Sequence, residues 1–268
     1  MRRLIWQTAL FLFLTFLTEI GGLVYLAASM LARIGGRRPQ FAKLLIFIPL
    51  YAGATMVTRH VAPLLNRVPL SCLSDSKTVI SVSSPFFCIL NRNYATPQLR
   101  DAADALATQM ATVFPGTATL ALDANFPYFD GFPLLPHLSH DDGRKLDIAF
   151  YYRKSGSYQP GLTRSPVGYF AFEQPRTGDV LPCADRNDWL TLRWDLPFLQ
   201  ALFPSYELDN DRMREALRWL ANEGKTFGVE KVFIEPHLVS RLGVEHDNVR
   251  FQGCRAARHD DHIHFQVR

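Results

Sequence analysis

The chain ends in the stretch RHDDHIHFQVR, residues 258–268, in which polar and apolar side chains alternate. A period of two is typical of a β-strand with one face against a core, and it predicts a strand over HIHFQV, residues 262–267. His262 and His264 then share one face of the strand, and the apolar residues beside them face the core. A solvated tail needs no such cluster of histidines, so the pattern predicts a site.

A second stretch, LSHDDGRKLDIAFYY, covers residues 138–152 and carries the same kinds of side chain. Asp147 follows His140 by seven positions and opens an apolar strand pattern. A turn at Gly143 can bring the two around one point. Imidazole and carboxylate groups together suit Zn²⁺, and catalytic zinc sites commonly use three protein ligands and keep a fourth position for water. The two stretches together predict one zinc ion per chain.

The composition is that of a folded protein with a modest positive charge. Of its 268 residues, 48% are hydrophobic and 20% are charged, which excludes a disordered chain. The net charge is +4, without basic runs interleaved with aromatic residues, so nucleic acid is not an expected partner. The four cysteines form no CxxC pair. Two disulfides outside the cytoplasm and four buried thiols are both compatible with their number.

Residues 1–67 are predicted to anchor the chain in a membrane. Residues 4–31 are apolar over more than the roughly 20 residues that a spanning helix needs, and they predict a first transmembrane helix. A cleaved signal ending near residues 27–29 is the alternative. Residues 41–60 predict a second transmembrane helix, with a re-entrant or interfacial helix as its alternative. We expect Glu19 to face this second helix in its protonated form, without a catalytic role.

The basic residues near the two predicted helices indicate their orientation. The intervening loop has the highest density of them, at Arg33, Arg37, Arg38 and Lys43. Because basic loops stay in the cytoplasm, this loop is predicted to lie inside, although two arginines at the N-terminus oppose it. The C-terminal part of the chain then faces the periplasm or the cell exterior from the cytoplasmic membrane.

Residues 68–268 are predicted to form one α+β domain. A period near 3.6 predicts helices over residues 96–114 and 209–228, the first capped by Thr96. Strand patterns cover residues 117–124, 145–153, 167–175, 229–236 and 262–267. The elements do not alternate regularly, which predicts an antiparallel or mixed central sheet with flanking helices. The Pro- and Gly-rich loop over residues 127–140 is predicted to line a cleft.

Both histidine-bearing stretches resemble those of the penicillin-insensitive murein endopeptidases. Their group also includes lysostaphin-type enzymes, D-Ala-D-Ala metallopeptidases and the hedgehog signalling domain. In murein endopeptidases, Ser-His-x-x-Gly-x-x-x-Asp and His-Asp-Asp-His-x-His stretches are similar to SHDDGRKLD and HDDHIH here. The resemblance implies a hedgehog or D-Ala-D-Ala peptidase-like fold and the cleavage of peptide cross-links in peptidoglycan. It implies zinc ligands at His140, Asp147 and His264, a catalytic His262, and a further active-site histidine, His259.

Other interpretations of these residues stay open. His137 and His237 compete as ligands, although both are typical of ordinary loop histidines. A membrane-anchored domain that binds zinc without hydrolysis, for adhesion or regulation, is the alternative function, because the hedgehog domain need not act as a peptidase. A phosphoesterase is disfavoured, because those enzymes place a His-x-His early in the chain. Murein endopeptidases are secreted with a cleaved signal, whereas this chain is predicted to keep two membrane helices.

Overall fold

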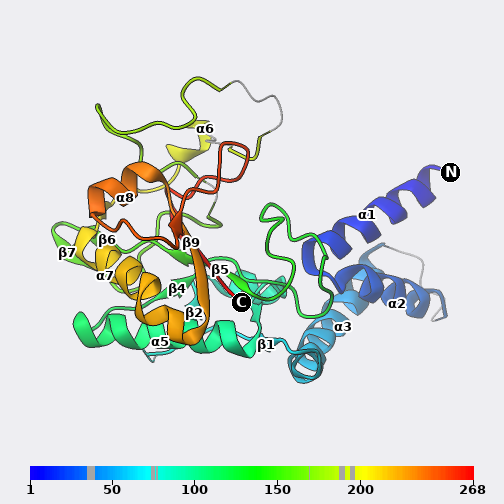
Figure 1. Cartoon of the computed structure of the whole chain (residues 1–268). Coiled ribbons are helices and arrows are strands. Elements are labelled where there is room, and N and C mark those ends of the chain that lie inside the picture. The colour runs from blue at the N-terminus through cyan, green and yellow to red at the C-terminus, as the bar shows by residue number, and fades with distance from the viewer. Residues whose placement is uncertain (35–39, 74–75, 77, 169, 187–190, 194–196) are drawn as a thin grey trace.

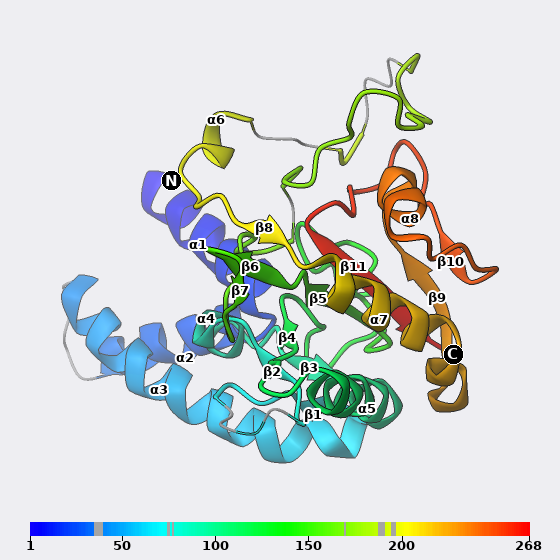
Figure 2. The ribbon, with the colours of Figure 1, turned by 90° about the vertical axis from the view of Figure 1, so that its left-hand side faces the viewer.

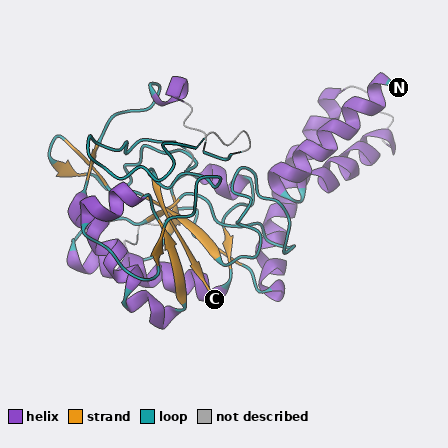
Figure 3. Cartoon of the chain, turned by 45° about the horizontal axis from the view of Figure 1, so that its top comes forward, coloured by secondary structure: helices purple, strands orange, loops and turns teal. Residues whose placement is uncertain are grey.

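The computed structural model describes residues 1–34, 40–73, 76, 78–168, 170–186, 191–193 and 197–268. Three N-terminal helices project from a domain built around a six-stranded sheet (Figures 1 and 3). The helices are α1 Arg2–Thr18, α2 Gly21–Ile34, α3 Gln40–Val61, α4 Pro85–Ile89, α5 Pro97–Val113, α6 Pro197–Gln200, α7 Asn210–Ala221 and α8 Pro236–Leu242, with short 3₁₀ helices at η1 Ala62–Leu65 and η2 Glu223–Phe227. The strands are β1 Val68–Pro69, β2 Ser81–Val82, β3 Tyr94–Ala95, β4 Leu120–Ala121, β5 Lys145–Ala149, β6 Tyr152–Lys154, β7 Ser157–Tyr158, β8 Glu207–Leu208, β9 Val229–Phe233, β10 Val249–Arg250 and β11 His262–Val267.

The first predicted transmembrane helix, residues 4–31, is wrong. The segment folds as α1, of 17 residues, and α2, of 14 residues, and the chain turns at Glu19, whose backbone φ is 65°. Both helices are shorter than the roughly 20 residues that span a bilayer. A buried carboxylate needs hydrogen-bond donors, and Glu19 finds them in the backbone of Tyr128 and Phe129 rather than in a neighbouring helix. The Glu19 carboxylate is therefore held by a loop of the C-terminal domain.

One helix among the described residues is long and apolar enough to cross a membrane. It covers Phe41–Leu65 and corresponds to the second predicted span, residues 41–60. Arg37 and Arg38, two of the basic residues from which the membrane orientation was predicted, lie outside the described residues. The structure therefore has one candidate membrane helix in place of the two that the sequence predicts.

The central sheet is mixed, as predicted, in an α+β domain. Its strand order is β10-β9-β11-β5-β4-β2, and only the pairs β10–β9 and β4–β2 are parallel. The C-terminal strand β11 lies between β5 and β9, so the end of the chain forms the middle of the sheet. A smaller sheet, β7-β6-β8, and the pair β1–β3 complete the strands.

The core lies between the sheet and two helices. Helices α5 and α7 contact each other and pack on the sheet (Figures 1 and 2). Both begin at a capping side chain: Thr96 accepts from the Leu99 amide, and Asp209 accepts from the Arg212 amide. On the sheet, the alternate residues Ile263 and Phe265 are completely buried against this layer. Their burial places the intervening histidines on the opposite face.

Two further expectations have outcomes in the structure. The described part of residues 167–175 is a loop, so the strand predicted there is wrong. Its backbone amides form hydrogen bonds outside any sheet: Phe170 donates to the Asp261 carboxylate and Glu173 to the Asp260 carbonyl.

The cysteines form two disulfides, Cys72–Cys88 and Cys183–Cys254. Disulfides persist in oxidising compartments, so the domain has the chemistry of an extracytoplasmic protein.

Candidate metal centre

Two neighbouring strands carry the sheet side of the centre. In the antiparallel pair of β11 and β5, His264 lies directly opposite Asp147, and His262 lies opposite Ala149. Opposite residues in such a pair place their side chains on the same face, so the register itself brings imidazole and carboxylate together. The His264 Nδ1 lies 2.9 Å from the Asp147 Oδ1. Both side chains are buried.

His140 comes from the loop side of the centre. Its Nδ1 lies 2.7 Å from the carbonyl oxygen of Ala124, which fixes the proton on that nitrogen and leaves the Nε2 lone pair pointing at the strands. The turn after His140 is fixed as well, because the Gly143 amide donates to the Asn125 side chain. Gly143 has a φ of 77°, and a Cβ there would lie 2.4 Å from the Arg67 guanidinium. The turn therefore requires glycine.

Three donor atoms converge at one point. The His140 Nε2 lies 3.1 Å from the His264 Nδ1 and 3.2 Å from the Asp147 Oδ1. Donor atoms of a tetrahedral zinc ion lie about 3.3 Å apart, because each is about 2.0–2.1 Å from the metal. Imidazole nitrogen and carboxylate oxygen are both donor types that bind Zn²⁺, so the three atoms suit a cation placed between them.

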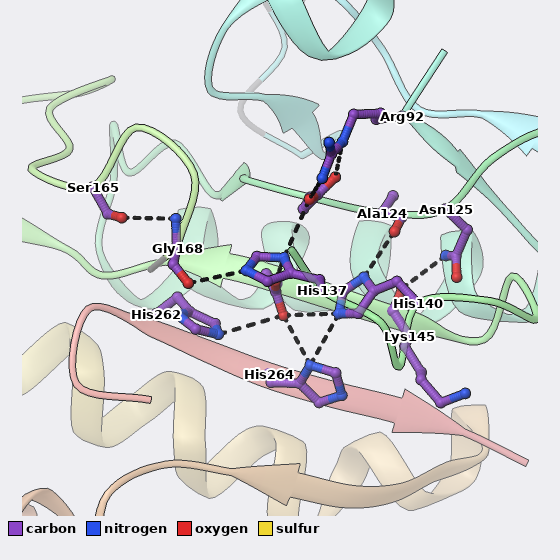
Figure 4. A network of polar contacts seen from close by, with 12 residues as sticks. Arg92, Ala124, Asn125, His137, His140, Lys145, Ser165, Gly168, His262 and His264 are labelled. Carbon is purple, nitrogen blue, oxygen red and sulfur yellow. Dashed lines mark hydrogen bonds and ion pairs between the residues drawn. The ribbon is translucent and has the colours of Figure 1, made fainter. Parts of the chain in front are cut away.

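His137 joins the same cluster from the other side of Asp147. Its Nδ1 lies 2.8 Å from the Asp147 Oδ2, and its Nε2 lies 3.1 Å from the carbonyl oxygen of Gly168. His137, His140 and Asp147 form a fully buried group whose ligand atoms all lie within 4.8 Å, close enough to hold a metal ion. The side chains of His137, His140, His262 and His264 point toward one another in Figure 4.

A buried ion pair supports His137 from behind. Asp123 lies 3.2 Å from the His137 Nδ1 and is held by Arg92, whose Nε donates to it at 3.0 Å. The Arg92 guanidinium also donates to the Leu135 carbonyl at 2.7 Å, so it ties the segment before β3 to the loop. Sequence reasoning missed this pair, because 31 positions separate its members and neither has a local motif.

His262 has a carboxylate partner of its own. Its Nδ1 lies 2.6 Å from the Asp261 Oδ1, and its Nε2 lies 3.6 Å from the Asp147 Oδ1. Asp261 is completely buried, and its other oxygen accepts from Ser165 and from the Phe170 amide. This arrangement orients the imidazole so that the Nε2 faces the cluster, as in sites where a carboxylate positions a catalytic histidine.

His259 lies beside the cluster and His237 lies apart from it. The His259 ring centre is 4.8 Å from that of His262 and 5.5 Å from that of His264. Its backbone amide donates to Glu235. His237 instead hydrogen-bonds to the Glu173 carbonyl and lines a different cavity. The structure thus brings together all five site residues that the sequence predicts, and it adds His137.

Burial and neighbouring charges separate the histidines into two kinds. Burial lowers the pKa of His264 to about 4 and lowers the pKa of His259 well below its ordinary value, so both are neutral at pH 7. Burial also opposes the charging of His137, but Asp147 and Asp123 outweigh it and raise the pKa of His137 to about 10. A neutral imidazole offers a lone pair to a metal, whereas a protonated one does not.

A disulfide-linked segment lies over the centre. The cavity above the cluster has a volume of about 70 Å³ and is lined by Leu192, Gln252, Ala256 and Ala257 as well as by the histidines. The Leu192 amide donates to the Arg255 carbonyl at 2.9 Å, and the Cys183–Cys254 disulfide joins the same two segments. Among the described residues, the centre therefore lies between the sheet, the loop over residues 127–140 and this disulfide-linked cover.

Comparison with known proteins adds no family. No model of a known protein family matches the chain, and no curated protein is detectably similar to it.

Proposed function

We propose that this chain is a membrane-anchored zinc metallopeptidase that hydrolyses peptide bonds in peptidoglycan. The proposal is supported above all by the convergence of His140, Asp147 and His264, whose donor atoms lie 2.9–3.2 Å from one another in a buried site. We assign these three residues as the zinc ligands. His137 forms an alternative set with His140 and Asp147, but its position between two carboxylates suits a protonated hydrogen-bond donor better than a ligand.

The remaining histidines have roles that follow from their positions. A bound Zn²⁺ ion supplies Lewis acidity and a water that ionises near neutral pH. His262 is the proposed catalytic group: Asp261 holds its Nδ1, so its Nε2 can exchange a proton or donate to a developing oxyanion. His259 supports it, because its ring lies beside those of His262 and His264 and stays neutral.

The substrate class rests on the resemblance and on the compartment. The stretches SHDDGRKLD and HDDHIH resemble those of murein endopeptidases, and all of their histidines and Asp147 lie at the cluster. One candidate membrane helix and two disulfides suit a domain on the outer side of the cytoplasmic membrane, where peptidoglycan lies. The basic residues before and at the start of the helix, Arg33 and Lys43 among them, favour the same orientation.

A zinc-binding domain without hydrolytic activity is the second candidate. The small cavity of about 70 Å³ favours it, because that volume holds a few water molecules and no peptide. Under the peptidase proposal, the segment around Gln252 and Ala256 must move to admit a substrate. Under the second candidate, zinc is structural and this segment keeps its position.

The full chain in detergent tests both candidates. We expect about one zinc per chain in the parent, its loss in His140→Ala, and its retention in the control His60→Ala, whose imidazole is exposed on α3. His262→Ala is expected to keep zinc and to lose cleavage of purified muropeptides. A folded parent without zinc, after Zn²⁺ is offered, would overturn both candidates. Zinc binding without cleavage in the parent would favour the second.

A further inference from the structure

The N-terminal helices contact the loop over residues 127–140, which carries two histidines of the metal centre. At the break between α1 and α2, the Glu19 carboxylate accepts two hydrogen bonds from this loop: one from the Phe129 amide at 2.9 Å and one from the Tyr128 amide at 3.1 Å. Glu19 is only 5% exposed. Figure 1 shows the loop reaching from the sheet to α1 and α2.

Three further contacts reach the same few residues. The Tyr128 hydroxyl donates to Thr58 of α3 at 2.8 Å. The Phe132 ring lies 6.0 Å from that of Phe16 in α1. Arg67, which follows the anchor, forms an ion pair with Asp130. Contacts from α1, from α3 and from the segment after α3 therefore all fall within residues 128–132.

The held segment is connected to the metal ligands by the backbone. The Gly131 amide donates to the Asp141 carbonyl at 2.7 Å, directly after His140. The His140 amide donates in turn to the His137 carbonyl at 2.9 Å. Arg67 also packs against the Cα of Gly143 on the far side of His140. A displacement of residues 128–132 is therefore transmitted to the positions of both histidines.

A membrane anchor alone does not need Glu19. Apolar helices can turn at glycine or asparagine, whereas a buried carboxylate costs free energy unless donors satisfy it. Here both oxygens are satisfied, and both donors belong to the loop of the metal centre. The two hydrogen bonds therefore join the turn between α1 and α2 directly to this loop.

We propose that Glu19 is a positioning residue that holds the loop over residues 127–140 in its metal-binding conformation, so the turn between α1 and α2 is part of the site. The inference rests on the proposed function as far as it concerns zinc. It assigns the helices a regulatory coupling: whatever displaces α1 and α2 from the domain also loosens His137 and His140.

The test compares Glu19→Ala and Glu19→Gln with Gln7→Ala in the full chain in detergent. Gln7 lies in α1 away from the loop and serves as the matched control. Zinc affinity is measured by competition with a chromophoric chelator, and hydrogen exchange is followed in peptides covering residues 126–141. We expect zinc binding in Glu19→Ala to weaken by up to about tenfold, the lower end of what loss of a ligand's own hydrogen-bond partner costs, because Glu19 acts on His140 only through the loop. Exchange in these peptides should become faster.

Glu19→Gln distinguishes a Glu19 that holds the loop through both oxygens, here called the clamp, from a Glu19 that only ends helix α1, here called a helix break. Its amide oxygen can accept one of the two loop amides, whereas its NH₂ cannot accept the other. The clamp predicts an intermediate zinc affinity, and a helix break predicts the affinity of the parent. Parent-like affinity and exchange in both Glu19 variants would overturn the proposal.

Two provisions keep the outcome decisive. If Glu19→Ala does not fold, Tyr128→Phe takes its place, because it removes only the hydrogen bond to Thr58. Tyr128→Phe should show weaker zinc binding and faster exchange to a smaller extent. If neither zinc affinity nor exchange changes, the coupling between the helices and the loop is overturned. If the parent binds no zinc, the proposed function fails, and hydrogen exchange alone decides on the clamp. Faster exchange of residues 126–141 in Glu19→Ala but not in Gln7→Ala would support it, and equal exchange would overturn it.

Discussion

The candidate metal centre is built from two kinds of backbone. On the sheet side, paired strands carry Asp147, His262 and His264, and the strand register and the buried face of β11 determine their positions. On the loop side, His137 and His140 lie in a segment without regular structure, and individual polar contacts determine their positions.

The difference between the two sides indicates which substitutions should disturb the site. Ladder hydrogen bonds come from the backbone of any residue, so the sheet side depends mainly on apolar packing behind it. The loop side depends on hydrogen bonds from particular side chains, such as Arg92 and Glu19. The predictions below compare the two sides, from the largest expected effect to the smallest.

The first prediction asks whether the third zinc ligand, beside His140 and Asp147, comes from the sheet side as His264 or from the loop side as His137. We expect His264→Ala, on the sheet side, to lose stoichiometric zinc at concentrations that saturate the parent. His137→Ala, on the loop side, should bind zinc about 10–100-fold more weakly, because it removes a hydrogen bond to the ligand Asp147 rather than a ligand. Isothermal titration with Zn²⁺ measures both. The reverse order would make His137 the ligand and contradict our assignment.

Phe265→Ala tests the packing behind the sheet side. Phe265 is completely buried between β11 and the helices, so its truncation should lower the free energy of unfolding by about 3–5 kcal/mol. Denaturant titration of the parent and the variant measures the loss. Phe198→Ala is the control, because this side chain is 73% exposed, and its effect should stay within about 0.5 kcal/mol. A loss for Phe265→Ala below 1 kcal/mol would refute tight packing there.

Arg92→Met tests the polar support of the loop side. It leaves the Asp123 carboxylate buried without its main partner, which should cost about 3 kcal/mol, because His137 still lies beside Asp123. Unlike Phe265→Ala, it should also weaken zinc binding in the fraction that stays folded, since Arg92 holds the loop at Leu135. Arg100→Met, an exposed arginine with a single i,i+4 partner, should change stability by less than about 0.5 kcal/mol.

The smallest expected effect is a pH dependence of the stability that Asp209 contributes at the start of α7. Burial raises the pKa of Asp209, but hydrogen bonds from Arg153 and Arg212 outweigh it, so its pKa lies below the ordinary value. The stability it contributes is complete above about pH 4, the unfolded pKa, and is lost as pH falls through the folded pKa. The difference in stability between the parent and Asp209→Asn should therefore shrink between pH 6 and pH 3. A constant difference would refute this role.

Local signals in the sequence predicted much of the domain. The alternation in HIHFQV predicted β11 because strand geometry has a period of two, and Thr96 predicted the start of α5 because a hydroxyl there satisfies a free amide. The histidine and aspartate pattern predicted the cluster of His140, Asp147 and His264, because side chains on paired strands and a short turn have few ways to be arranged. These signals act over a few residues, so a chain displays them before it folds.

Only the tertiary structure decided the rest. The turn at Glu19 depends on amides more than a hundred positions away, and an apolar stretch carries no sign of them. The disulfide pairing and the Arg92–Asp123 pair also join distant segments. His137 changed from a plain loop histidine to a member of the cluster because folding places it beside Asp147. Sequence by itself determined elements with a clear period, such as β11 and α5, and the chemistry of the donor set. Long-range packing decided which donors meet, what holds them, and where the chain departs from the predicted elements, as at Glu19 and over residues 167–175.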